Sequence, residues 1–120
     1  MSPHGRSILV VDPDPCILDL LHLALTEMGF LPRTAISVVT ALAASRVQPP
    51  DLALIDMDVD GWPDLIAGLE TLNPQVRCCL VDAGVGGTRS AEELTKLGVH
   101  QRFCKPFTLE QLKNALIEEA

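Results

Sequence analysis

The stretch "ILVVDPDP", from Ile8 to Pro15, predicts both the kind of fold and the place of its functional site. Four consecutive apolar residues are typical of a strand that is buried on both faces. Asp12 and Asp14 follow at once, with Pro13 between them. Carboxylates at the end of a buried strand indicate a bound cation or a phosphate nearby. A proline in the middle of such a site is unexpected, because it has neither a carboxylate nor an N–H group.

The same alternation continues along the chain, with short apolar runs followed by segments of helical periodicity. Strands covered on both faces form a parallel sheet, and right-handed crossovers place helices on either side of it. We therefore expect a three-layer, doubly wound (βα)5 fold of the flavodoxin-like class, as a single domain over residues 1–120 with about 7–118 structured. The expected strands are 7–11, 31–35, 52–55, 77–81 and 101–104, and the expected helices are 15–29, 37–47, 63–72 and two that open at the capping boxes of Ser90 and Thr108.

Composition excludes several classes of function. The net charge of −7 and the scarcity of aromatic residues argue against a nucleic-acid surface, which needs a basic footprint. The longest apolar runs are far shorter than the ~20 residues that span a bilayer. We expect a soluble, cytoplasmic protein that binds neither nucleic acid nor membrane.

The four cysteines lack the spacing of a metal site. Cys16, Cys78, Cys79 and Cys104 form no CxxC or CxxH motif. Cys78 and Cys79 are neighbours in an apolar run, so in a strand their side chains face opposite sides. We interpret the cysteines as small buried hydrophobic residues rather than zinc ligands or a disulfide.

Charged residues follow four of the predicted strands. They are Asp12, then Asp56 and Asp58, then Asp82, and finally Lys105. Because ligands bind beyond the carboxyl ends of parallel strands, these side chains are expected to converge. Carboxylates beside one lysine suit Mg²⁺ and a phosphoryl group, whose charge the ammonium offsets. A carboxylate such as Asp56 can act as the nucleophile and form an aspartyl phosphate.

With these residues in order, the chain resembles the receiver domains of bacterial response regulators, the CheY-like proteins of two-component signalling. The resemblance rests on "ILVVD", "PDLALIDMDVDG" and "KPF", and covers residues 7 to 118. It implies that Asp56 is the phosphoacceptor, that Lys105 contacts the phosphoryl group, and that Mg²⁺ is held by Asp12, Asp56 and the backbone carbonyl of Asp58.

The resemblance also implies partners. A histidine kinase or phosphotransfer protein would supply the phosphoryl group, and Asp56 would pass the signal on by a conformational change. The last two helices would form a surface for a second copy of the chain or for a downstream output domain. The peptide bond before Pro106 is expected to be cis, as receivers of this type usually have it.

Four positions depart from the pattern of the family. Pro13 stands where the family has the acidic residue that ligates Mg²⁺ directly, so we expect weak or no Mg²⁺ binding. Asp82 stands in place of the usual Thr or Ser, Arg102 in place of the aromatic switch residue, and Asp60 in place of a proline. The nucleophile and the lysine are retained.

Each unusual residue has a structural as well as a functional interpretation. Asp14 before a proline is typical of a helix N-cap, and the alternative is a substitute metal ligand. Asp82 either fills the phosphoryl pocket and pairs with Lys105, or is a solvated loop residue turned outward before "AGVGG" (83–87). Arg102 is either surface charge on an edge strand or a partner contact, and Trp62 is either a packed loop residue or a lid.

Three functions remain open from the sequence. The first is a phosphorylated receiver, and the second is a degenerate receiver that serves as a phosphorylation-independent interaction or dimerisation module. The third is a phosphatase of the haloacid dehalogenase type, in which the two aspartates of "DMD" are nucleophile and acid/base. Asp60 does not match that family, and we expect no cap domain, so we also expect no turnover of phosphate esters.

Overall fold

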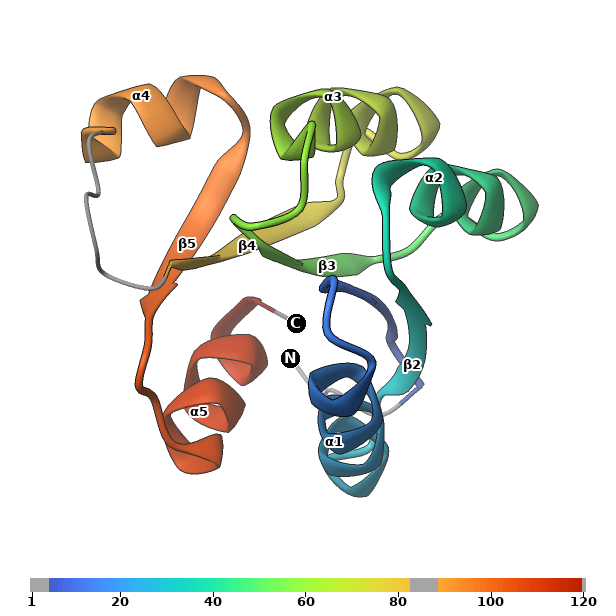
Figure 1. The fold of residues 1–120 in the computed structure, drawn as a ribbon, viewed down its shortest axis with the longest axis vertical. Helices are drawn as coiled ribbons and strands as arrows, with labels where there is room; N and C mark the ends of the chain where they lie inside the picture. Colours follow the sequence, from blue (N-terminus) through green and yellow to red (C-terminus); the bar gives the residue numbers. More distant parts are fainter. Residues whose placement is uncertain (1–4, 83–88, 120) are drawn as a thin grey trace.

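The computed structural model describes residues 5–82 and 89–119 and has the predicted alternation of strands and helices. The strands lie parallel in one sheet of order β2-β1-β3-β4-β5. In Figure 1 helices α1 and α5 cover one face of the sheet, and α2, α3 and α4 cover the other. The elements are β1 Ser7–Val11, α1 Pro15–Glu27, β2 Leu31–Ala35, α2 Val38–Val47, β3 Leu52–Asp56, α3 Trp62–Leu72, β4 Arg77–Asp82, α4 Ala91–Lys96, β5 Val99–Cys104 and α5 Leu109–Glu119.

The hydrophobic core consists of two clusters, one on each face of the sheet. Alternate residues of each central strand enter opposite clusters, as the two-residue period of a strand requires. In β1, Leu9 packs toward α2 and α3, whereas Ile8 and Val10 pack toward α1 and α5. Full burial of a side chain of this size stabilises a fold by about 1.5–3 kcal/mol. The three-layer prediction is confirmed.

The caps of the helices follow from local sequence. The carboxylate of Asp14 accepts a hydrogen bond from the backbone N–H of Cys16, which confirms the N-cap interpretation. The predicted capping box of α5 is present, with Thr108 and Gln111 bonded in both directions. At α4, the Ser90 hydroxyl accepts from the N–H of Glu93.

The structure corrects several boundaries and one prediction about cysteines. Strand β5 begins at Val99, two residues earlier than expected, and the register shifts opposite Cys78 and Cys79. These two cysteines are buried on opposite faces, as predicted. Cys16 and Cys104 are exposed, so the expectation that they are buried is wrong. Both lie where the chain leaves the packed layers, at the start of α1 and the end of β5.

Helix length bears on membrane insertion. Over residues 5–82 and 89–119, no helix is long and apolar enough to cross a membrane.

Candidate functional site

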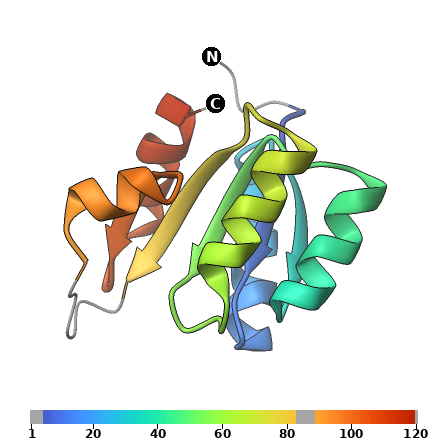
Figure 2. The same cartoon turned by 90° about the horizontal axis from the view of Figure 1, so that it is seen from above.

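The carboxyl ends of four neighbouring strands bring the predicted site residues to one edge of the sheet. In Figure 2 the strand arrows point toward this edge, where the loop between β3 and α3 also lies. Asp12 directly follows β1, Asp56 and Asp82 are the last residues of β3 and β4, and Lys105 directly follows β5. Each position is fixed by the register of a buried strand, because a slip by one residue would turn an apolar side chain to the wrong layer.

Both carboxylate oxygens of Asp56 are held in place. The Lys105 ammonium donates to Oδ2 at 2.9 Å, and the backbone N–H of Asp58 donates to Oδ1 at 2.8 Å. Only 5% of Asp56 is exposed, whereas 39% of the Lys105 side chain is. The hydrogen bond to Asp56 raises the pKa of Lys105 above its ordinary value. The lysine is therefore a fixed positive charge on a nearly buried carboxylate.

A second carboxylate lies beside this pair. Asp12 is 6% exposed, and its Oδ1 accepts a hydrogen bond of 2.8 Å from the backbone N–H of Asp14. Burial raises the pKa of Asp12, and the nearby negative charge of Asp56 raises it further, while the Asp14 N–H and Lys105 act in the opposite direction. Two like charges thus share one edge, a situation that a bound cation would relieve.

The donors present suit a hard cation only in part. Pro13 is exposed and offers no ligand, and the side chain of Asp14 caps α1. In the part of the chain that the structure describes, no group of three or more His, Cys, Asp or Glu side chains is arranged to hold a metal ion. Mg²⁺ nevertheless needs only one or two carboxylates when water and phosphate oxygens complete its shell. Asp12 and Asp56 supply two, so the residues fit a loosely held Mg²⁺.

Asp82 is buried, and its side chain forms an ion pair with Arg102. It is 5% exposed, so the outward, solvated arrangement is wrong. Its Oδ2 lies 3.9 Å from Nη1 of Arg102, and the Lys105 ammonium pairs with Asp56. That Asp82 fills the phosphoryl pocket stays a prediction. Residues 83–87, which follow Asp82, lie outside the described part. Arg102 is on the edge strand and partly exposed, as expected, but it also forms an ion pair with a buried carboxylate.

Sequence reasoning did not find Arg89. Its guanidinium lies 5.4 Å from the centre of the Trp62 ring, and Trp62 is only 7% exposed as the first residue of α3. A cation over an indole face is favourable by about 0.5–1 kcal/mol at an exposed site. The tryptophan is a packed residue that links α3 to the segment before α4, and nothing in the sequence pairs these two distant positions.

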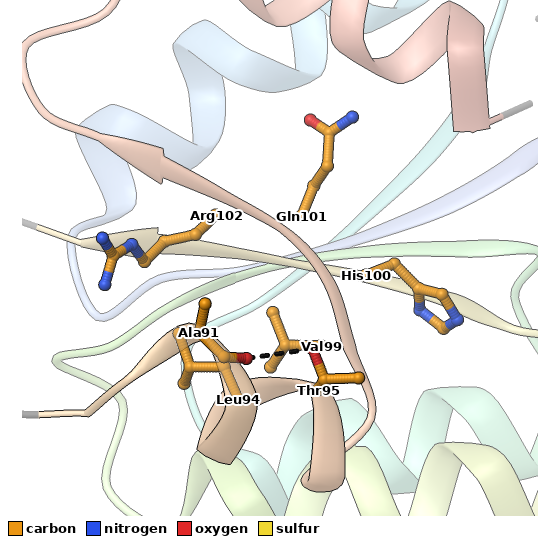
Figure 3. Close-up of a pocket in the computed structure, with 7 residues that line it drawn as sticks. All are labelled: Ala91, Leu94, Thr95, Val99, His100, Gln101 and Arg102. Carbon is orange, nitrogen blue, oxygen red and sulfur yellow. Dashed lines mark hydrogen bonds between the residues drawn. The ribbon is translucent and has the colours of Figure 1, made fainter.

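A recess of about 150 Å³ lies between α4 and β5, in the region predicted as a partner surface. Figure 3 shows Leu94 and Thr95 from α4 facing Val99, while Arg102 points away from His100. The Thr95 hydroxyl is used within the helix, where it donates to a backbone carbonyl. His100 reaches back to the neighbouring strand, where its Nδ1 accepts from the Cys78 N–H at 3.2 Å. The floor is apolar and the rim is polar.

The peptide bond between Lys105 and Pro106 is cis, as expected from the resemblance.

Comparison with known proteins gives a consistent result. The model of the response regulator receiver domain matches residues 8–117. The chain is 29% identical to the photosynthetic apparatus regulatory protein RegA of Cereibacter sphaeroides, over 93% of this chain and 61% of RegA. It is 26% identical to sporulation initiation phosphotransferase F of Bacillus subtilis, over 93% and 91% of the two chains. The chain therefore spans about three-fifths of one relative and nearly all of the other.

Solved structures agree. The crystal structure of NtrX from Brucella abortus in complex with ADP superposes with a TM-score of 0.84 at 28% identity, over 96% of this chain and 26% of that one. Receiver domains typically bind Mg²⁺ at their phosphorylation site and interact with histidine kinases or phosphotransfer proteins. The strand order, the acidic edge with its lysine and the match over residues 8–117 agree: the chain belongs to the response regulator receiver domain family.

Proposed function

We propose that this chain accepts a phosphoryl group on Asp56 from the phosphohistidine of a kinase or phosphotransfer protein. The observation that carries the proposal is the geometry of Asp56, a nearly buried carboxylate with an ammonium at 2.9 Å. A carboxylate oxygen of Asp56 would form the new P–O bond while the P–N bond to the donor imidazole breaks. The departing imidazole nitrogen keeps the electron pair of the broken bond and takes up a proton from solvent, and Lys105 offsets the phosphoryl charge.

Mg²⁺ belongs to the same proposal. Asp12, Asp56 and the backbone carbonyl of Asp58 would hold it, and when bound it supplies positive charge to the phosphoryl oxygens. The role of Asp14 as a substitute metal ligand stays a prediction, because its Oδ1 already caps α1. With Pro13 in place of a ligand, we expect Mg²⁺ to bind at least about tenfold more weakly than to a site with one more carboxylate.

The surface beside Lys105 suits the partner. A groove of about 560 Å³ opens there between α1 and the start of α5. Leu20 and Leu109 on its two sides are 54% and 45% exposed and, together with the other apolar lining residues, leave an apolar surface open to a partner. An amphipathic helix that carries the phosphohistidine would bury them. The groove is lined by Ile17, Leu20, Leu21, Lys105, Pro106, Phe107 and Leu109.

The phosphoryl acceptor is tested by intact mass after incubation with Mg²⁺ and acetyl phosphate. The wild type is expected to gain one phosphoryl group and Asp56→Asn none, because asparagine lacks the nucleophilic oxygen. Equal uptake by both chains would place the modification elsewhere. No turnover of p-nitrophenyl phosphate is expected, and steady turnover would point instead to a phosphatase.

The docking groove is tested with two leucines of the same helix. Leu20→Glu is expected to slow transfer from a phosphohistidine protein while leaving uptake from acetyl phosphate unchanged. Leu23→Glu is the matched control, because Leu23 is 60% exposed on α1 but does not line the groove. Equal slowing by both variants would argue against docking at this groove.

A second function, a receiver that acts without phosphorylation, is favoured by specific observations. Pro13 offers no side-chain metal ligand, and Asp82, the last residue of β4, is a carboxylate that pairs with Arg102. Such a chain would serve as an interaction or dimerisation module through the α4–β5 and α5 surface. Failure of the wild type to take up phosphoryl at high Mg²⁺ would favour this alternative.

A further inference from the structure

The ion pair between Asp82 and Arg102 joins the ends of two neighbouring strands. Only 8% of the Asp82 side chain is exposed, compared with 40% of the Arg102 side chain. In the register of the sheet Asp82 lies opposite Cys104, so Arg102 reaches along the edge strand toward the carboxyl end of β4. Figure 3 shows this side chain extended away from Gln101 and His100. The arginine thus brings a partly solvated charge to a nearly buried one.

Asp82 also belongs to the frame of the phosphoryl site. Its backbone carbonyl accepts a hydrogen bond of 2.7 Å from the backbone N–H of Lys105, whose ammonium binds Asp56. On the other side, Val81 lies opposite Asp56, and its carbonyl accepts from the N–H of Met57. The backbone of Asp82 is therefore bonded to that of Lys105, and the residue before it lies opposite Asp56 in the sheet.

The net charge at this edge of the sheet affects how readily a charged ligand approaches Asp56. Asp12 and Asp56 are nearly buried, and the Lys105 ammonium binds Asp56 at 2.9 Å. An aspartyl phosphate adds further negative charge in the same place. A third carboxylate without its cation would repel an anionic phosphodonor across a medium that screens poorly.

We propose that Arg102 is a positioning residue of the phosphoryl site, acting through Asp82: it neutralises the Asp82 carboxylate so that an anionic donor can approach Asp56. This inference rests on the proposed function. Arg102 does not touch the reacting atoms in this arrangement. Its effect is electrostatic, and a second substitution at Asp82 should therefore cancel the effect of removing it.

The first test follows phosphorylation of the full chain by acetyl phosphate, with intact mass as the readout. Arg102→Gln is expected to react about three- to tenfold more slowly than wild type, because an uncompensated charge at the end of the neighbouring strand changes the local potential by about that order. Asp82→Asn/Arg102→Gln is expected to react within about twofold of Asp82→Asn, since the uncompensated charge is gone. Arg102→Lys retains the charge and is expected to stay close to wild type.

The second test uses a probe of opposite charge. Mg²⁺ alone, titrated by calorimetry, should bind Arg102→Gln about three- to tenfold more tightly than wild type, because the edge is more negative. The double variant should return to the affinity of Asp82→Asn. If Arg102→Gln slows the reaction with the anionic donor but tightens the binding of Mg²⁺, the effect is one of charge, because structural damage would weaken both.

Three results would overturn the inference. They are a wild-type rate for Arg102→Gln, a double variant as slow as Arg102→Gln, and weaker Mg²⁺ binding by Arg102→Gln. The proposed function fails separately, if the wild type takes up no phosphoryl group or Asp56→Asn takes it up equally. In that case the Mg²⁺ titration still decides whether Arg102 controls the charge of the site.

Discussion

Replacing Asp12 with asparagine is expected to make the folded chain more stable at neutral pH. Asp12 and Asp56 are 6% and 5% exposed and carry the same charge. Asparagine keeps an oxygen that can accept the 2.8 Å hydrogen bond from the Asp14 N–H, but it removes the charge. The substitution therefore isolates the electrostatic cost of an acidic pair at a functional site.

The size of the gain follows from the two carboxylates and their shared cation. Two unit charges about 4 Å apart interact with roughly 4 kcal/mol at the effective dielectric near a protein surface. Lys105 and solvent screening offset part of this repulsion, and the Lys105 side chain is 39% exposed. We expect a net gain of about 1–2 kcal/mol in the free energy of unfolding.

The pH dependence has a definite sign. The pKa of Asp12 is raised above 3.8 by burial first and by Asp56 second, so the folded chain binds this proton more tightly than the unfolded chain does. The stability that Asp12 contributes is therefore full below pH 3.8 and lost as the pH rises through the raised pKa. The advantage of Asp12→Asn should be greatest at neutral pH and shrink toward pH 3.8.

Urea unfolding followed by circular dichroism measures this difference, at a series of pH values from neutral downward. Asp58→Asn is the control, because Asp58 is an exposed carboxylate of the same edge. The reasoning is refuted if Asp12→Asn gives no gain at neutral pH, or a gain that does not change with pH. A gain accompanied by weaker Mg²⁺ binding would show that the acidic pair is kept for function at the expense of stability.

Three further predictions concern other parts of the molecule. Gly98→Ala should lower the free energy of unfolding by about 2–3 kcal/mol, because φ is +93° and a Cβ would come within 2.6 Å of a side-chain oxygen of Glu70. Gly5→Ala is the control: with φ +78° and open space around it, it should lower the free energy of unfolding by only about 1 kcal/mol. Lys105→Gln should cost about 1 kcal/mol at neutral pH, and the difference in urea midpoint should persist below pH 10.5 and disappear as the pH rises through the raised pKa of Lys105. Burial raises the pKa of Cys78 to about 12, so iodoacetamide at mildly alkaline pH should modify the exposed Cys104 and leave Cys78 intact; peptide mass mapping that finds both modified equally would contradict this.

The fold was predictable because its signals are local. Apolar runs such as 8–11 and 52–55 specify buried strands, and the alternation with helices leaves one common topology. The start of β5 was not predictable, since it depends on the register shift at Cys78 and on the bond from its N–H to His100. The register of a strand depends on its contacts with the neighbouring strand, so the residue pattern of one strand alone does not predict it.

The site was predictable in position but not in pairing. Asp12, Asp56 and Lys105 follow from the ends of parallel strands, which must meet at one edge. The ion pair between Asp82 and Arg102 depends on side-chain conformation, and no sequence pattern predicts it. The position of a charge on the chain therefore indicates where it acts, whereas its partner depends on tertiary packing.

The two outer strands of the sheet also affect how copies of the chain can meet. Unpaired edge strands are templates for intermolecular strand pairing. On one edge, β2 carries Pro32, which has no N–H group to donate. On the other, β5 is shifted in register and carries Arg102, which binds inward. Both edges are poor templates for cross-chain hydrogen bonding, so a concentrated solution should resist aggregation through strand addition, and self-association should proceed through the helical faces.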